Sequence, residues 1–116
     1  MTVLSCSLAG LRQRVTIRPG TRAASLYGVT SAEEDFFCKY GVNPAWADRL
    51  QDAGLRVSGV GDDGEMRIVE LPDHPFFLPM LFLPQARSSA AAPHPVLVGF
   101  LDAARAFEAR RARRGA

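Results

Sequence analysis

The order of the predicted elements places this chain of 116 residues in the α/β class. Short apolar strands come first, and a helix, a strand hairpin, one more apolar strand and a final helix follow. At this length the chain forms at most one domain, so we expect residues 1–116 to share one mixed sheet with two main helices. Two helices leave part of such a sheet uncovered, and an uncovered apolar face promotes association. We therefore expect self-association or docking onto another polypeptide.

Short strands separated by turn residues fill the first third of the chain. Apolar residues predict strands at residues 2–8, 13–17 and 35–42. A short segment at residues 23–27 is expected to end at Gly28. The acidic residues 33–35 are expected to form a solvated loop face.

A short helix is predicted after these strands. Asn43 and Pro44 are typical of a helix start, because the Asn side chain caps free N–H groups and Pro suits the first helical position. Trp46 and Leu50 lie one turn apart and are expected to be buried. Gly54 ends the helix.

The second half of the chain predicts a hairpin, a strand and a long helix. Residues 55–60 and 65–71 are strand-like, and residues 61–64, Gly-Asp-Asp-Gly, are typical of a hairpin turn. Residues 77–82 are expected to form a further apolar strand. Pro95 opens the final helix. Its predicted buried stripe consists of Leu97, Phe100, Leu101, Ala104 and Phe107.

Charge and composition exclude several classes of protein. The net charge is +2 and Lys39 is the only lysine, which is not the composition of a nucleic-acid-binding protein. The arginine-rich residues 105–116 are expected to form a solvated helix end or tail, although such a run can also contact phosphates. No apolar run is long enough to span a membrane, and no secretory signal is visible. A cytoplasmic protein without a membrane partner is expected.

Cys6 and Cys38 are the two cysteines, too few and too far apart for a disulfide framework or a zinc signature. We expect reduced, mostly buried thiols, with a bridge between them as the alternative. Cys38 beside Lys39 is a candidate nucleophile, but neighbouring residues of a strand point to opposite faces. A structural thiol is therefore favoured.

Residues 71–85 read Leu-Pro-Asp-His-Pro-Phe-Phe-Leu-Pro-Met-Leu-Phe-Leu-Pro-Gln. This segment resembles the stretch of the glutamine amidotransferase domain of CTP synthase that ends in Phe-His-Pro-Glu. Further matches follow the family's order and spacing between Cys6 and Ala104: Tyr27-Gly28, Tyr40, Val42, Asn43, Ala53-Gly54-Leu55, Asp63-Gly64 and His94-Pro95. The chain is similar to the bacterial proteins related to the C-terminal region of CTP synthase. The resemblance implies a partial class I amidotransferase-like (flavodoxin-like) layer, the C-terminal half of that domain.

The resemblance also implies that the family's catalytic groups are missing. Those enzymes use a Cys nucleophile on a strand-to-helix elbow, a His base and a Glu that orients the His. Leu83 stands at the His position and Gln85 at the Glu position, so the proton chemistry is lost. Lys39 replaces the glutamine-binding Arg, residues 35–39 replace a basic motif, and no Gly-x-Cys-x-Gly occurs. We expect no catalytic residue.

Ligand binding without catalysis is expected at the same place. The four candidates, by analogy with the family, are Lys39, Tyr40, Gln85 and Arg87. Amide and cationic groups that converge there suit a carboxylate. His74 and His94 each precede a proline, and the resemblance implies turn and helix-entry roles for them in place of metal binding. No cofactor and no metal is expected.

Two functions follow from these observations. The first is a catalytically inactive amidotransferase-like protein that works as a binding or interaction module, self-associating or docked on another amidotransferase-like half. The alternative is the C-terminal part of an enzyme whose nucleophile half lies upstream or on another chain.

Overall fold

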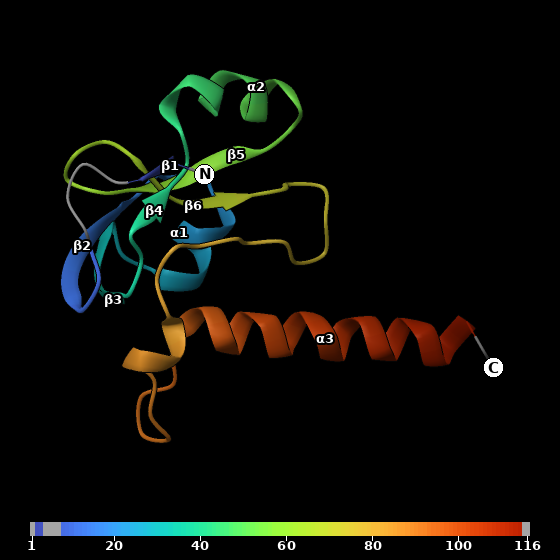
Figure 1. Cartoon of the computed structure of the whole chain (residues 1–116). Coiled ribbons are helices and arrows are strands. Elements are labelled where there is room, and N and C mark those ends of the chain that lie inside the picture. Colours follow the sequence, from blue (N-terminus) through green and yellow to red (C-terminus); the bar gives the residue numbers. More distant parts are fainter. Residues whose placement is uncertain (1, 4–7, 115–116) are drawn as a thin grey trace.

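The computed structural model describes residues 2–3 and 8–114 of the chain (Figure 1). Its elements are β1 (Thr2–Val3), β2 (Leu11–Ile17), α1 (Arg22–Tyr27), β3 (Ser31–Phe36), β4 (Tyr40–Gly41), the 3-10 turn η1 (Pro44–Trp46), α2 (Ala47–Asp52), β5 (Arg56–Val60), β6 (Met66–Glu70), the 3-10 turn η2 (Pro84–Arg87) and α3 (Pro95–Arg114). Within this part of the chain, no helix is long and apolar enough to cross a membrane.

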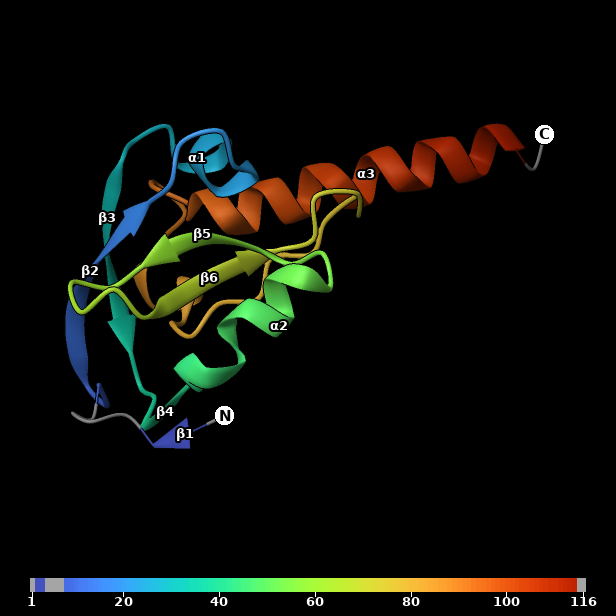
Figure 2. The ribbon, with the colours of Figure 1, turned by 90° about the horizontal axis from the view of Figure 1, so that it is seen from above.

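A four-stranded antiparallel sheet in the order β3-β2-β5-β6 forms the body of the protein. Helices α1 and α3 lie on one face of this sheet and α2 lies on the other, as the two views show (Figures 1 and 2). The short strands β1 and β4 pair separately. The predicted α/β class and its amidotransferase-like layer are confirmed, but the single mixed sheet is wrong, because the described strands form two sheets in which every pair is antiparallel.

The core lies between the sheet and the helices α1 and α3. Its buried residues are Leu8, Val15, Ile17, Ala23, Phe36, Ile68, Leu78, Phe82 and Val96. Phe36 from β3 meets Phe82 edge to face, with ring centroids 5.6 Å apart. Because β3 and β6 are the two outer strands, the segment that carries Phe82 joins both edges of the curved sheet.

That segment, residues 77–83, differs from the strand predicted at residues 77–82. It is extended, but it makes only isolated bridges, from Phe82 to Phe36 and from Met80 to Ile68. Its hydrogen bonds run from alternate residues, as in Leu81 N–H to Arg67 O at 3.1 Å. The N–H groups of Leu78, Met80 and Phe82 find no acceptor within residues 2–3 and 8–114. The segment therefore uses only one of its own two edges, the one formed by its odd-numbered residues, for backbone hydrogen bonds.

Other predicted strands have different bounds in the structure, and the one predicted at residues 13–17 is longer, as β2 (Leu11–Ile17). The strand predicted at residues 35–42 is wrong, because β3 ends at Phe36 and only Tyr40–Gly41 returns to a strand. The acidic residues 33–35 belong to β3 and are no solvated loop, since Glu34 is fully buried. Residues 4–7 of the first predicted strand, Cys6 among them, lie outside the described residues.

The short helices α1 and α2 begin and end at capping residues. The Thr21 hydroxyl accepts a hydrogen bond from Ala24 N–H at the start of α1, and Gly28 ends the helix with a φ of 69°. Asn43 Oδ1 accepts from Ala45 N–H at 3.0 Å in the predicted manner. The predicted burial of Trp46 is wrong, because its side chain is 52% exposed and the Arg49 guanidinium lies 4.7 Å from its ring centre. A cation–π contact at the surface replaces the expected core contact.

Helix α3 turns most of its predicted buried stripe toward solvent, and only Leu97 of the stripe is partly buried. The residues that it buries are Val96 and Gly99, and Gly99 faces Leu26 of α1 so closely that an added Cβ would lie 2.5 Å from Leu26 Cδ2. The side chains of Phe100, Leu101 and Phe107 are 54%, 54% and 56% exposed. We call Leu97, Phe100, Leu101, Ala104 and Phe107 the α3 stripe. The prediction failed because periodicity finds an apolar face but not its neighbour.

Candidate functional site

The two positions that the resemblance assigns to the catalytic His and Glu lie at the end of segment 77–83. Leu83 is 39% exposed, and its N–H donates to the Asp35 carbonyl oxygen at 3.1 Å. Gln85 is exposed on η2. An isobutyl group neither accepts nor donates a proton, and an amide has no charge with which to orient an imidazolium. Neither side chain supplies acid–base chemistry.

Asp35, whose backbone carbonyl oxygen accepts from Leu83 N–H, also carries a carboxylate. Arg12 Nε donates to Asp35 Oδ1 at 2.8 Å. This hydrogen bond and the charge of Arg12 hold the pKa of Asp35 below its ordinary value, and the charge of Arg87 acts in the same direction. Asp35 is therefore held as an anion in an ion pair, a poor candidate for a general acid or base near neutral pH.

Two of the four predicted ligand-binding residues lie around one hollow. Lys39 and Tyr40 line a surface hollow of about 350 Å³ together with Cys38 and Leu81. The Cys38 thiol is partly buried and donates to the Leu81 carbonyl oxygen at 2.7 Å, the contact of a structural thiol. Gln85 and Arg87 are not among the residues that line this hollow. Lys39 and Tyr40 thus share the hollow, and Gln85 and Arg87 share the turn η2. Binding of one ligand by all four residues stays a prediction.

The structure also contains a buried polar cluster, which the sequence did not predict. It consists of Tyr27 at the end of α1, Glu34 in the middle of β3 and His94 just before α3. His94 Nε2 lies 2.6 Å from Glu34 Oε2, and the Tyr27 hydroxyl donates to the same oxygen. Both His94 and Glu34 are buried. We call these three residues the buried triad.

Hydrogen bonds fix the protonation pattern of the triad. Val96 N–H donates to His94 Nδ1 at 3.1 Å, so Nδ1 carries no proton and Nε2–H is the donor to Glu34. Burial, and then the hydrogen bond to Glu34, raise the pKa of the Tyr27 hydroxyl, which stays protonated. Glu34 Oε1 has no hydrogen-bond partner among the described residues. Oε2 therefore takes both donors.

The triad supports the start of α3, with His94 and Glu34 buried and Tyr27 partly exposed. His94 precedes the first residue of α3, and its Nδ1 accepts a backbone N–H from the first turn, as a capping side chain does. His74 makes the same contact with Phe76 N–H at 3.1 Å but lies at the surface. The turn and helix-entry roles expected of the two histidines agree with these contacts. Within the described residues no three His, Cys, Asp or Glu side chains gather as a metal site would require.

The fold is that of a glutaminase-type amidotransferase domain. Its backbone matches the glutaminase domain of Trypanosoma brucei CTPS, solved with bound acivicin, with a TM-score of 0.79 and 29% sequence identity. The match covers 85% of this chain and 40% of that one. No family model matches the sequence.

Sequence comparison gives the particular family. The chain is 44% identical over 89 residues to the CTP synthase of Flavobacterium johnsoniae, covering 76% of this chain and 17% of that protein. It is 43% identical over 103 residues to the CTP synthase of Pyrobaculum aerophilum, covering 88% of this chain and 19% of that protein. The chain is therefore a relative of the glutamine amidotransferase domain of CTP synthase, and the resemblance read from residues 71–85 is confirmed. It spans less than a fifth of the length of these curated relatives.

Proposed function

We propose that this chain is an amidotransferase-like interaction module without glutaminase activity of its own. The observation that carries the proposal is the chemistry at residues 83 and 85, where Leu83 and Gln85 stand in place of a base and its orienting carboxylate. The carboxylate of Asp35, the residue whose backbone oxygen accepts from Leu83 N–H, is paired with Arg12 at 2.8 Å. A glutaminase needs a nucleophile, a base and an orienting group together, so the loss of two of them removes the reaction.

The α3 stripe is the proposed docking surface. Three large apolar side chains more than half exposed on one helix form a patch of the kind that marks protein–protein contacts. Segment 77–83 adds an N–H at Met80, a partly exposed residue, that is unpaired within the described part of the chain, whereas those of Leu78 and Phe82 lie in the core. The proposed occupant is a second amidotransferase-like half, because the match covers only 40% of the glutaminase-domain chain and leaves the larger part of it without a counterpart here.

Glutaminase activity is tested by ammonia release from glutamine with the purified chain and a coupled dehydrogenase readout. The expected rate equals that of a control without protein. Ammonia release that rises with the concentration of the chain would overturn the proposal.

The docking surface is tested by light scattering after size exclusion, with the chain alone and with a separately produced amidotransferase half from a CTP synthase relative. We expect a complex with that half, weakened by Leu101→Glu on the stripe. Ala106→Glu is the matched control, because it adds the same charge at an exposed position on the opposite side of the helix. Self-association that Leu101→Glu abolishes would make a second copy the partner. Equal complexes for both variants would refute a role for the stripe.

A second function keeps support from the comparisons. Sequence identity of 44% with a CTP synthase favours the C-terminal part of an enzyme whose nucleophile half lies on another segment or chain. In that case the mixture of the two halves, and neither half alone, would release ammonia. A silent mixture that forms the complex supports the interaction module.

A further inference from the structure

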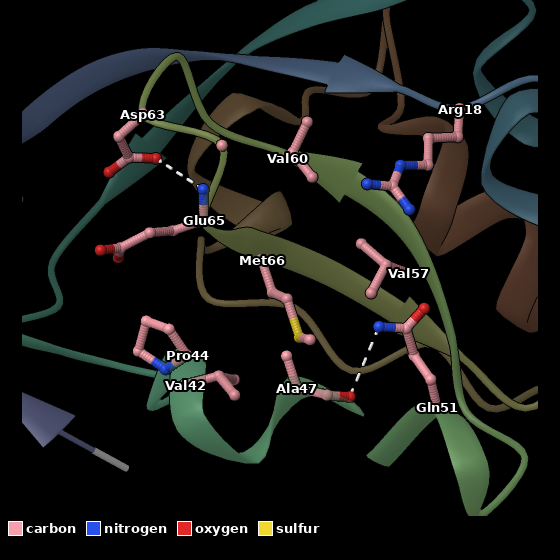
Figure 3. Close-up of a pocket in the computed structure, with 11 residues that line it drawn as sticks. Arg18, Val42, Pro44, Ala47, Gln51, Val57, Val60, Asp63, Glu65 and Met66 are labelled. Carbon is pink, nitrogen blue, oxygen red and sulfur yellow. Dashed lines mark hydrogen bonds between the residues drawn. The ribbon is translucent and has the colours of Figure 1, made fainter. Parts of the chain in front are cut away.

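A second surface, remote from the α3 stripe, carries the features of a small-molecule site. A pocket of about 450 Å³ lies between α2 and the hairpin of β5 and β6 (Figure 3). This is the face of the sheet opposite to α1 and α3 (Figure 2). The volume is within the usual range for ligand sites. The inference therefore goes beyond the proposed docking function and does not depend on it.

One end of the pocket is polar. The guanidinium of Arg18 and the side-chain amide of Gln51 both point to this end, on either side of Val57 (Figure 3). The Arg18 side chain makes no hydrogen bond and no ion pair with any residue in 2–3 or 8–114. Gln51 Nε2 donates to the Ala47 carbonyl oxygen over 3.4 Å, which is close to the limit for a hydrogen bond. Both groups are free to bind an anion.

Arg18 differs in this respect from the arginines of the neighbouring strands. Each of those is paired with a carboxylate: Arg12 with Asp35, Arg14 with Asp62, Arg56 with Glu70, and Arg67 with Asp63. The sheet thus satisfies its other cations internally. Arg18, one residue beyond β2, lines the pocket and is unpaired within the part of the chain that the structure describes.

The remaining walls select the shape and charge of the ligand. Val42, Val57, Val60 and Met66 supply an apolar floor. The opposite rim carries Asp63 and Glu65, whose carboxylates lie 2.9 Å and 3.7 Å from Arg67 and point away from the floor (Figure 3). Negative charge at that rim repels a second anionic group on the ligand.

We propose that this pocket binds a monocarboxylate with a short apolar body. The carboxylate accepts hydrogen bonds from the Arg18 guanidinium, in the two-point geometry that arginine offers, and from Gln51 Nε2. The apolar body lies on Val57, Val60 and Met66. Dicarboxylates bind more weakly, because their second group meets Asp63 and Glu65.

The test uses phenylbutyrate as the probe and follows backbone amide resonances of the full chain by NMR. Saturable shifts are expected at Val57, Val60 and Met66. Phenylbutanol, which has the same body without the charge, should bind about tenfold more weakly, the effect of losing one charge-assisted contact. Arg18→Gln should weaken phenylbutyrate binding by a similar factor. Arg105→Gln, the same change on α3, should leave it unchanged.

Several results would overturn the proposal. Equal affinity for the acid and the alcohol would remove the role of Arg18, as would an unchanged affinity in Arg18→Gln. Shifts confined to the α3 stripe would place the probe on the docking surface. Gln51→Leu, at a solvent-accessible position of the pocket rim, is the second variant, expected to weaken binding of the acid and leave binding of the alcohol unchanged. If both arginine and glutamine variants bind like the unmodified chain, the pocket is no carboxylate site.

Discussion

Replacing His94 by Ala tests the account of the buried triad most directly, because the chain contains its own control. His94 and His74 each precede a proline, and each accepts a backbone N–H two residues on at 3.1 Å through Nδ1. His94 alone is buried and bonded to a buried carboxylate, Glu34, at 2.6 Å. The difference between His94→Ala and His74→Ala therefore isolates the buried contact.

The size of the effect follows from the contacts. The shared hydrogen bond to the backbone contributes about 0.5–1.5 kcal/mol and cancels between the two variants. Removing the His94 donor costs about 1–3 kcal/mol or more, because the charged Glu34 carboxylate stays buried with one hydrogen bond fewer. The loss of ring contacts with Tyr27 and Phe82 adds to this. We expect His94→Ala to lower the free energy of unfolding by about 3 kcal/mol more than His74→Ala, from the lost donor and the lost ring packing together.

Urea unfolding followed by circular dichroism measures both variants. With a slope near 1.5 kcal/mol per molar urea, taken from the usual range, the midpoint of His94→Ala should lie about 2 M below that of His74→Ala. His94→Gln, which keeps a donor for Glu34, should fall between them. Equal midpoints for the two alanine variants would refute the reasoning, because the bond to Glu34 would then contribute nothing.

Two further predictions concern Tyr27 and Gly99. The pKa of Tyr27 is raised in the folded chain, so the folded chain keeps a proton that the unfolded chain releases near pH 10.0. The free energy of unfolding should therefore fall as the pH rises above that value, by at most about 1.4 kcal/mol per pH unit. In alkaline urea titrations Tyr27→Phe should lack this fall, and Tyr40→Phe, at an exposed position, should retain it. Gly99→Ala places a methyl group 2.5 Å from Leu26 and should cost about 1–3 kcal/mol. Adding Leu26→Ala should recover part of that loss, and simple additivity in this double-mutant cycle would contradict the close contact.

Local signals in the sequence predicted the local structure well. The cap at Asn43, the stop at Gly54, with its φ of 106°, and the hairpin at residues 61–64 all depend on neighbours within a few residues. Such contacts are encoded in adjacent side chains, so sequence order is enough to find them. The same holds for the start of α3 at Pro95.

Contacts between distant segments escaped prediction. Glu34 and His94 are 60 residues apart, and an acidic residue in a charged triplet reads as solvated until the histidine that buries it is placed. The apolar period of α3 is real, but Gly99, a residue without a side chain, is the point of contact with α1. Periodicity weighs large apolar residues and therefore selected Phe100 in place of Gly99. Leu83 and Gln85 were matched to the catalytic His and Glu positions by family resemblance, because local sequence patterns carry no information about those positions.

The way in which α3 is attached has a consequence for how fast its amide protons exchange. Contacts to α1 and the triad hold its first turns, whereas every residue from Ala104 to Arg114 is exposed and the helix extends beyond the body of the protein (Figures 1 and 2). A helix of that length without a supporting surface is marginal in water. Deuterium should therefore enter the amides of residues 104–114 rapidly in the free chain, while those near Gly99 stay protected. Slowed uptake at residues 104–114 would then report a bound partner without any label on it.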